Sequence, residues 1–134
     1  MKKSGKSFMR KKLVFKREVV NSMLSFFKMH HPNEAILVLR GTNKKDSILI
    51  DSLMIPPFSE GGPYYSGFPT YMLPGDISIL GTAHSHPSGN AQPSLTDLNH
   101  FTGIVGVIAS YPYEDNDLFA YNSDGEKLEF SVQD

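Results

Sequence analysis

The chain has 134 residues, enough to bury the core of one domain, and it has no cysteine, which excludes disulfides, thiolate metal sites and cysteine nucleophiles. No apolar run approaches the roughly 20 residues of a membrane span, and no apolar stretch follows the basic N-terminus as in a secretory signal, so we expect a cytoplasmic protein. Eight of the 13 basic residues precede the first acidic residue, Glu18, and the other five accompany 14 acidic residues. This acidic body argues against contact with a nucleic-acid backbone.

The beginning of the chain predicts a leader followed by a helix. We interpret residues 1–14 as a basic, solvated and disordered leader, and residues 15–134 as a single folded domain. From 15 to 30 the apolar residues recur at helical spacing, which predicts an amphipathic helix packed on a sheet. Two histidines and a proline end this helix.

Two strands and a long loop come next. Residues 35–39 form a continuous apolar run, which predicts a buried strand, and residues 47–55 predict a second strand after a polar turn at 41–46. Residues 56–74 are rich in glycine, proline and aromatic residues, and loops of this length are usually functional or disordered. We expect its segment 61–71 to be either a gate beside the active site or a loop without a role.

The rest of the chain predicts a second strand-rich part of the same domain. Residues 76–86 form a strand that ends in two histidines, residues 94–101 a short helix, and residues 104–110 a buried strand. Residues 118–122 and 127–132 are interpreted as the two arms of a hairpin, because a Ser-Asp-Gly turn lies between them.

The residues with metal-binding chemistry gather between 84 and 97. His84 and His86 are two apart on the predicted strand, so both side chains project to one face and can reach one ion. Pro87 stops the strand, and Ser94 is a good N-cap for the next helix. Asp97 lies in the first turn of that helix and can turn its carboxylate toward the histidines. Two imidazoles and one carboxylate leave a fourth position for water, which is typical of catalytic zinc.

Each half of this pattern also has an ordinary structural explanation. Two histidines two apart are common on surface strands, and Ser94 with Asp97 resembles a helix capping box, although that box prefers Glu or Gln in place of the aspartate. The ordinary explanations require both segments to occur in this order, across a proline-bounded turn, by accident. The metal site is therefore the favoured interpretation.

At this point the sequence resembles the JAMM motif of the MPN (Mov34/PAD-1) metalloproteases. His84, His86, Ser94 and Asp97 match that motif without a gap, and Glu34 occupies the place of the glutamate that such motifs expect at the start of an apolar strand. The resemblance runs from about residue 15 to 132, and over this range the chain is similar to the small archaeal single-domain members of the family. Members of this family cleave ubiquitin or ubiquitin-like modifiers from lysine.

The resemblance implies residue roles and a fold. Zinc would lower the pKa of a bound water to about 7, Glu34 would be the general base, and the Ser94 hydroxyl would stabilise the oxyanion. Spacing alone favours a solvated Glu34 at a strand entry, whereas Ser94 can be a cap only, or can cap the helix with its backbone while its hydroxyl faces the substrate. The implied fold is α/β, a single compact domain with a mixed, curved sheet flanked by helices, in a cytidine-deaminase-like layout. Deamination itself is excluded, because it needs a Pro-Cys-x-x-Cys segment and a His-x-Glu pair.

The expected function is a zinc isopeptidase that removes a ubiquitin-like small modifier from its lysine conjugates. Three other functions remain open. A sulfur-carrier peptidase would process the C-terminus of a ubiquitin-like carrier, and a RadC-like protein would associate with DNA, against which the acidic body argues. A non-catalytic scaffold would have lost metal ligands, whereas here every ligand position is filled. Oligomeric state is not indicated by the sequence.

Overall fold

The first strand begins inside the segment that we expected to be a leader. The computed structural model describes residues 11–56 and 78–134, and its strand β1 (Lys12–Lys16) pairs in parallel with two other strands. Leu13 and Phe15 are buried in the core, with the alternation of a strand. The domain therefore starts before residue 15, and the predicted helix starts two residues later than expected. The remainder of the predicted leader, residues 1–10, lies outside the described residues.

The described residues form the following elements. In chain order they are β1 (Lys12–Lys16), α2 (Arg17–His30), β2 (Ile36–Asn43), β3 (Ser47–Met54), β4 (Ile79–His86), α4 (Leu95–Asn99), β5 (Val105–Ser110), the 3₁₀ turn η2 (Asp115–Asp117), β6 (Leu118–Tyr121), β7 (Lys127–Leu128) and β8 (Ser131–Gln133). The predicted turn at 41–46 is shorter than expected. Strand β2 continues to Asn43, because a bulge between Arg40 and Gly41 carries it past the expected end.

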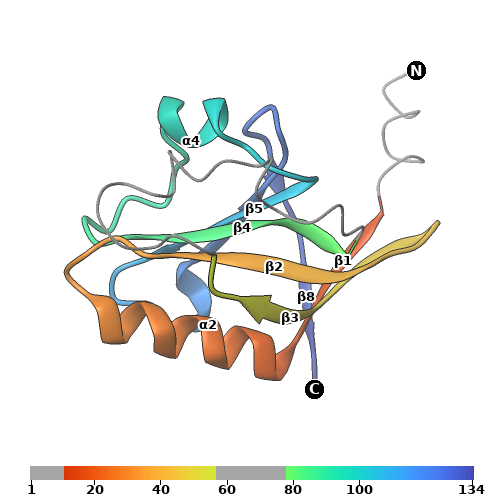
Figure 1. The fold of residues 1–134 in the computed structure, drawn as a ribbon, viewed down its shortest axis with the longest axis horizontal. Helices are drawn as coiled ribbons and strands as arrows, with labels where there is room; N and C mark the ends of the chain where they lie inside the picture. The colour runs from red at the N-terminus through yellow and green to blue at the C-terminus, as the bar shows by residue number, and fades with distance from the viewer. Residues whose placement is uncertain (1–10, 57–77) are drawn as a thin grey trace.

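One mixed sheet holds all of these strands, in the order β7-β6-β5-β4-β2-β3-β1-β8. The pairs β1–β3, β1–β8 and β4–β5 are parallel, and the other pairs are antiparallel. Helix α2 lies against one face of the sheet and α4 lies over the opposite face (Figure 1). This arrangement confirms the predicted α/β domain with a curved, mixed sheet between helices.

Helix α2 is amphipathic, as its spacing predicts. Five apolar residues of one face are buried: Val19, Val20, Met23, Leu24 and Phe27. They join the main core with residues of β1, β2, β3 and β5. The helix ends at His30, where we expected it to end, because the residue before a proline disfavours helical backbone and Pro32 follows His31. Among residues 11–56 and 78–134, no helix is long and apolar enough to cross a membrane.

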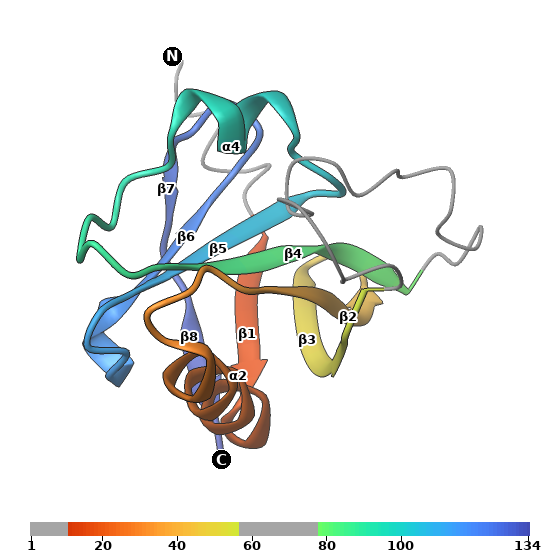
Figure 2. The same ribbon diagram turned by 60° about the vertical axis from the view of Figure 1, so that its left-hand side comes forward.

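The C-terminal hairpin is only partly as predicted. Strands β6 and β7 pair antiparallel around the expected turn, but the chain then leaves β6, and β8 pairs with β1 at the other edge of the sheet. The predicted second arm, 127–132, is therefore wrong beyond Leu128. Phe130 packs edge-on against Phe15 with ring centroids 5.2 Å apart, which draws this segment toward β1. Because only Glu129 and Phe130 separate the two edge strands, the sheet curls until its edges approach each other (Figure 2).

Candidate active site

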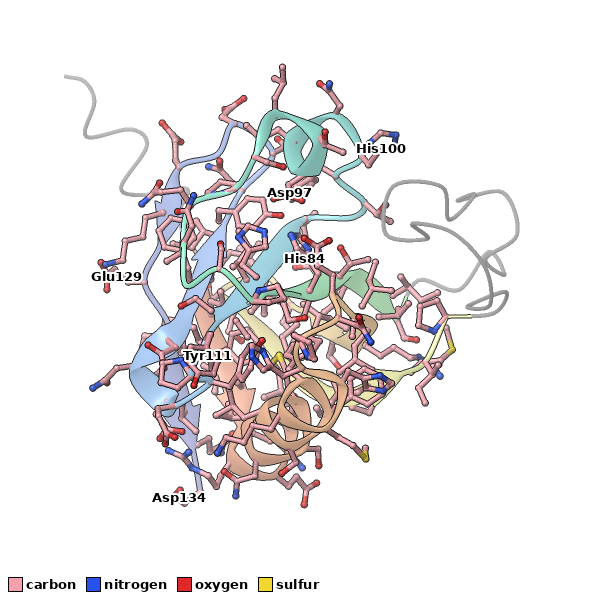
Figure 3. The ribbon with its side chains drawn as sticks, turned by 90° about the vertical axis from the view of Figure 1, so that its left-hand side faces the viewer. His84, Asp97, His100, Tyr111, Glu129 and Asp134 are labelled. Carbon is pink, nitrogen blue, oxygen red and sulfur yellow. The ribbon has the colours of Figure 1, made fainter. Side chains whose placement is uncertain are left out.

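The two predicted histidine ligands lie at the end of β4, near the middle of the sheet. His84 is 6% exposed and His86 is half-buried, and their ring centroids are 5.1 Å apart. The side chain of His84 points toward the face covered by α4 (Figure 3), and His86 shares that face because the two residues are two apart on one strand. Ser85 between them is fully buried. This is the geometry that the His-x-His spacing predicted.

Helix α4 brings Asp97 onto the two histidines. Its Oδ1 lies 3.0 Å from His84 Nε2, and its Oδ2 lies 3.2 Å from His86 Nε2. Asp97 is 7% exposed, and Figure 3 shows it between α4 and His84. One ligand atom from each of the three residues lies within 4.8 Å of the others. Such a cluster of two imidazole nitrogens and one carboxylate oxygen fits a catalytic zinc ion, which takes three protein ligands and one water.

The loop after β4 orients the second histidine. Its ring nitrogen Nδ1 lies 2.7 Å from the carbonyl oxygen of Asn90. A carbonyl oxygen only accepts hydrogen bonds, so His86 Nδ1 carries a proton, and in the neutral ring that binds a metal the lone pair is on Nε2, which faces Asp97. The loop folds back at Gly89, whose φ of 88° lies in the region that favours glycine.

The charges in this cluster are coupled. Burial by itself raises the pKa of Asp97, but the hydrogen bonds of His84 and His86, the charge of His84 and the backbone N–H of Ser94 hold it well below its ordinary value. Burial by itself lowers the pKa of His86, but Asp97, the Asn90 carbonyl and the charge of Glu34 raise it above its ordinary value. The site therefore keeps Asp97 as an anion, the form in which a carboxylate binds a metal.

Ser94 caps α4, as its position predicted. Its Oγ accepts a hydrogen bond from Asp97 N at 3.0 Å, and its own N–H donates to Asp97 Oδ2 at 2.7 Å. Aspartate thus closes a capping box that usually takes glutamate or glutamine. The Ser94 side chain is exposed, and a hydroxyl that accepts one hydrogen bond still has a proton to donate.

Glu34 lies at the entry to β2, the strand next to β4. It is exposed, and its neighbour Ala35 is hydrogen-bonded to Ser85, between the two histidines. The strand register ends with Ile36 paired to His84, two residues after Glu34 in the chain and two residues before His86. The charge of Glu34 contributes to raising the pKa of His86, so Glu34 lies near the rim of the metal cluster.

Comparison with known proteins identifies the group to which this architecture belongs. Residues 16–122 match the family model Prok-JAB, the prokaryotic homologs of the JAB domain. The chain belongs to this family.

The relatives of this JAB domain include a probable metalloprotease and a metalloprotease-like zinc site. It is 32% identical over 111 residues to a probable metalloprotease from Haloferax volcanii, covering 78% of this chain and 69% of that protein. Its structure is similar to a JAB1/MPN domain protein from Archaeoglobus fulgidus (TM-score 0.69, 32% identity, 92% of this chain and 99% of that one). It is also similar to a structure described as JAMM, a metalloprotease-like zinc site in the proteasome and signalosome (TM-score 0.65, 29% identity, 92% and 98%).

Zinc is the cofactor of this JAB domain, and its chemistry is that of a metal-dependent hydrolase of the metalloprotease type.

Two polar groups of the site were not found by sequence reasoning. Ser85 is a buried serine between two ligands, and that position in a strand was the signal that was available. The Asn90 carbonyl had no signal, because every residue has one. The predicted gate at 61–71 lies outside the described residues.

Proposed function

We propose that this JAB-family hydrolase is an isopeptidase that removes a ubiquitin-like small modifier from the lysine side chains of other proteins. The observation that carries the proposal is the convergence of His84, His86 and Asp97, with their ligand atoms within 4.8 Å, beside the exposed Glu34. The resemblance to the JAMM metalloproteases, whose members cleave such modifiers from lysine, supports the substrate class, together with the likeness to a metalloprotease-like zinc site in the proteasome and signalosome.

His84, His86 and Asp97 would hold the zinc. When bound there, zinc polarises the scissile carbonyl and makes water a nucleophile near neutral pH. Glu34 takes a proton from the attacking water and delivers it to the lysine nitrogen as the amide C–N bond breaks, since an amine does not depart as an anion. The Ser94 hydroxyl donates a hydrogen bond to the carbonyl oxygen as negative charge develops on it.

An isopeptide bond suits an exposed site of this kind. The scissile bond joins the flexible tail of the modifier to a lysine side chain, so neither partner has to unfold to reach the metal. Glu34 and Ser94 are both exposed, Glu34 two residues before β2 and Ser94 at the N-cap of α4, so the two residues come to the metal ligands from different elements. We expect a narrow approach between them that favours small residues, such as Gly-Gly, at the end of the tail.

The test is cleavage by the zinc-loaded protein of two modifiers joined to the same lysine peptide, one with a tail ending in Gly-Gly and one ending in Gly-Leu. Carrier–amino-acid adducts are incubated in parallel. We expect release of the Gly-Gly modifier at a rate well above that of the Gly-Leu modifier. Equal cleavage of both tails would contradict the narrow approach. Cleavage of the carrier adducts alone would replace the isopeptidase by a carrier-processing peptidase.

A further inference from the structure

Ser85 links the strand of the metal ligands to the segment that carries Glu34. Its side chain is 0% exposed and lies on the face of β4 opposite to His84 and His86. Its Oγ accepts a hydrogen bond from Ala35 N at 3.0 Å, and its own backbone N–H donates to Ala35 O at 3.1 Å. Both backbone polar groups of Ala35 are therefore held by one residue of β4.

This link holds the chain where the regular ladder of β2 has not yet begun. Strand β2 starts at Ile36, and the three residues before Ala35, Pro32 to Glu34, are exposed. A regular antiparallel pair would join Ala35 N to the carbonyl of Ser85, whereas here the Ser85 hydroxyl takes that hydrogen bond. Ala35 is thus the anchor that directly follows Glu34 in the chain, while on the other side Asn33 N donates to His30 O at 2.8 Å.

We propose that Ser85 is a positioning residue, which fixes Glu34 relative to the metal ligands through Ala35. The inference rests on the proposed role of Glu34 as the base. Ser85 touches neither metal nor substrate, since it points to the opposite face of the sheet. A base must lie within hydrogen-bond reach of the proton it takes, and a displacement of about 1 Å costs up to about 10²-fold in rate.

The experiment compares Ser85→Ala with Ser110→Ala in the zinc-loaded protein. Ser110 is a matched control, because it is a buried serine on the neighbouring strand, in register with His86, and its hydroxyl donates away from the site to Asp117 O. The substrate is the Gly-Gly modifier joined to a lysine peptide. We expect Ser85→Ala to bind one zinc, to keep KM and to lose kcat by roughly 10- to 100-fold. We expect Ser110→Ala to keep the KM and the kcat of the wild type. Ser85→Thr, which retains the hydroxyl, should recover most of the kcat that Ser85→Ala loses.

Two further measurements separate positioning from general damage to the fold. In a Glu34→Gln background, Ser85→Ala causes no additional loss of kcat, because the group that it positions is already gone. Amide hydrogen exchange at Ala35, measured by NMR without substrate, becomes faster in Ser85→Ala and stays slow in Ser110→Ala. If Ser85→Ala does not fold, Ser85→Cys replaces it with the same expectations, because a thiol is a weaker acceptor of similar size.

Each contrary result has a distinct meaning. A wild-type kcat in Ser85→Ala, unchanged exchange at Ala35, or a full additional loss in the Glu34→Gln background would overturn the role of Ser85 alone. A Glu34→Gln variant with normal turnover overturns the proposed base, and Ser85 as its positioning residue with it. A wild-type protein that leaves the conjugate intact overturns the proposed function as a whole.

Discussion

The Nδ1 of His86 donates its proton to the carbonyl oxygen of Asn90, 2.7 Å away, across a loop that depends on the positive φ of Gly89. Gly89→Ala places a side chain where the backbone favours glycine, although its Cβ would meet Tyr111 O only at an ordinary contact distance of 3.7 Å. The loop relaxes, the Asn90 carbonyl moves and His86 loses its orienting partner. We expect zinc affinity to fall by about 10- to 100-fold, measured by competition with a chelator. Asn90→Ala is the control, since it keeps the carbonyl and should retain most of the affinity.

Zinc content tests the ligand set directly. The purified JAB domain should hold one zinc per chain, and His86→Ala or Asp97→Ala should lose it, because three ligands become two. His100→Ala is the matched control, since His100 is an exposed histidine just after α4, and its ring Nδ1 lies 3.0 Å from the carbonyl oxygen of Thr96. Elemental analysis after purification without chelators gives the answer. A zinc-free wild type, or equal zinc loss in His100→Ala, would count against the assignment.

Replacement of Glu34 by glutamine removes the proposed base and keeps its shape. Glu34→Gln should retain zinc, because Glu34 is outside the ligand cluster, yet lose turnover by roughly 10²- to 10⁴-fold. Glu18→Gln is the control, at an exposed glutamate in the first turn of α2. Steady-state kinetics and zinc content are measured on the same preparations. Near-normal turnover of Glu34→Gln would mean that another group takes the proton.

The two roles of Ser94 can be separated by two substitutions. Ser94→Ala removes the cap of α4 and the proposed oxyanion donor, so it should cost about 1 kcal/mol of stability as well as activity. Ser94→Gly removes the donor, while glycine is tolerated at an N-cap at a cost of a few tenths of a kcal/mol. Both should lose about 10²- to 10³-fold in kcat. If activity instead follows the free energy of unfolding across the two variants, Ser94 acts only as a cap.

Alkaline pH should lower the free energy of unfolding of the domain, because Tyr121 is buried in it. Burial, with a smaller contribution from the charge of Asp97, raises the pKa of Tyr121 above its ordinary value. A phenol with a raised pKa in the folded state stabilises the fold fully below its unfolded pKa of about 10, and that contribution is lost as pH rises through the folded pKa. Relative to wild type, Tyr121→Phe should therefore gain stability between about pH 8 and about pH 11. Denaturant unfolding measures it, with the exposed Tyr111→Phe as control.

The metal ligands were predictable because local spacing determines their geometry. Two residues two apart on a strand share a face, and a residue in the first turn of the next helix returns to the strand that precedes it. Glu34 depends on a pairing between distant strands, so spacing alone favoured a solvated residue, and only a family resemblance connected it with the site.

The errors in the fold have a similar cause. Residues 127–132 have the composition of one continuous strand, and nothing local indicates that Phe130 packs on Phe15 and sends the last strand to the opposite edge. Likewise, the basic residues around Leu13 suggested a solvated leader, whereas the Leu13 side chain is buried in the core. In both cases, tertiary contacts outweigh the local sequence signal.

The position of β4 within the sheet has a consequence for how the metal is held. This strand is flanked by β2 and β5, with three strands on one side of it and four on the other, so partial unfolding that starts at an edge reaches it late. Asp97 is different, since it lies on the five-residue helix α4, outside the sheet. Release of zinc should therefore begin with the undocking of α4, while the two histidines stay in register, ready to rebind the ion when the helix returns.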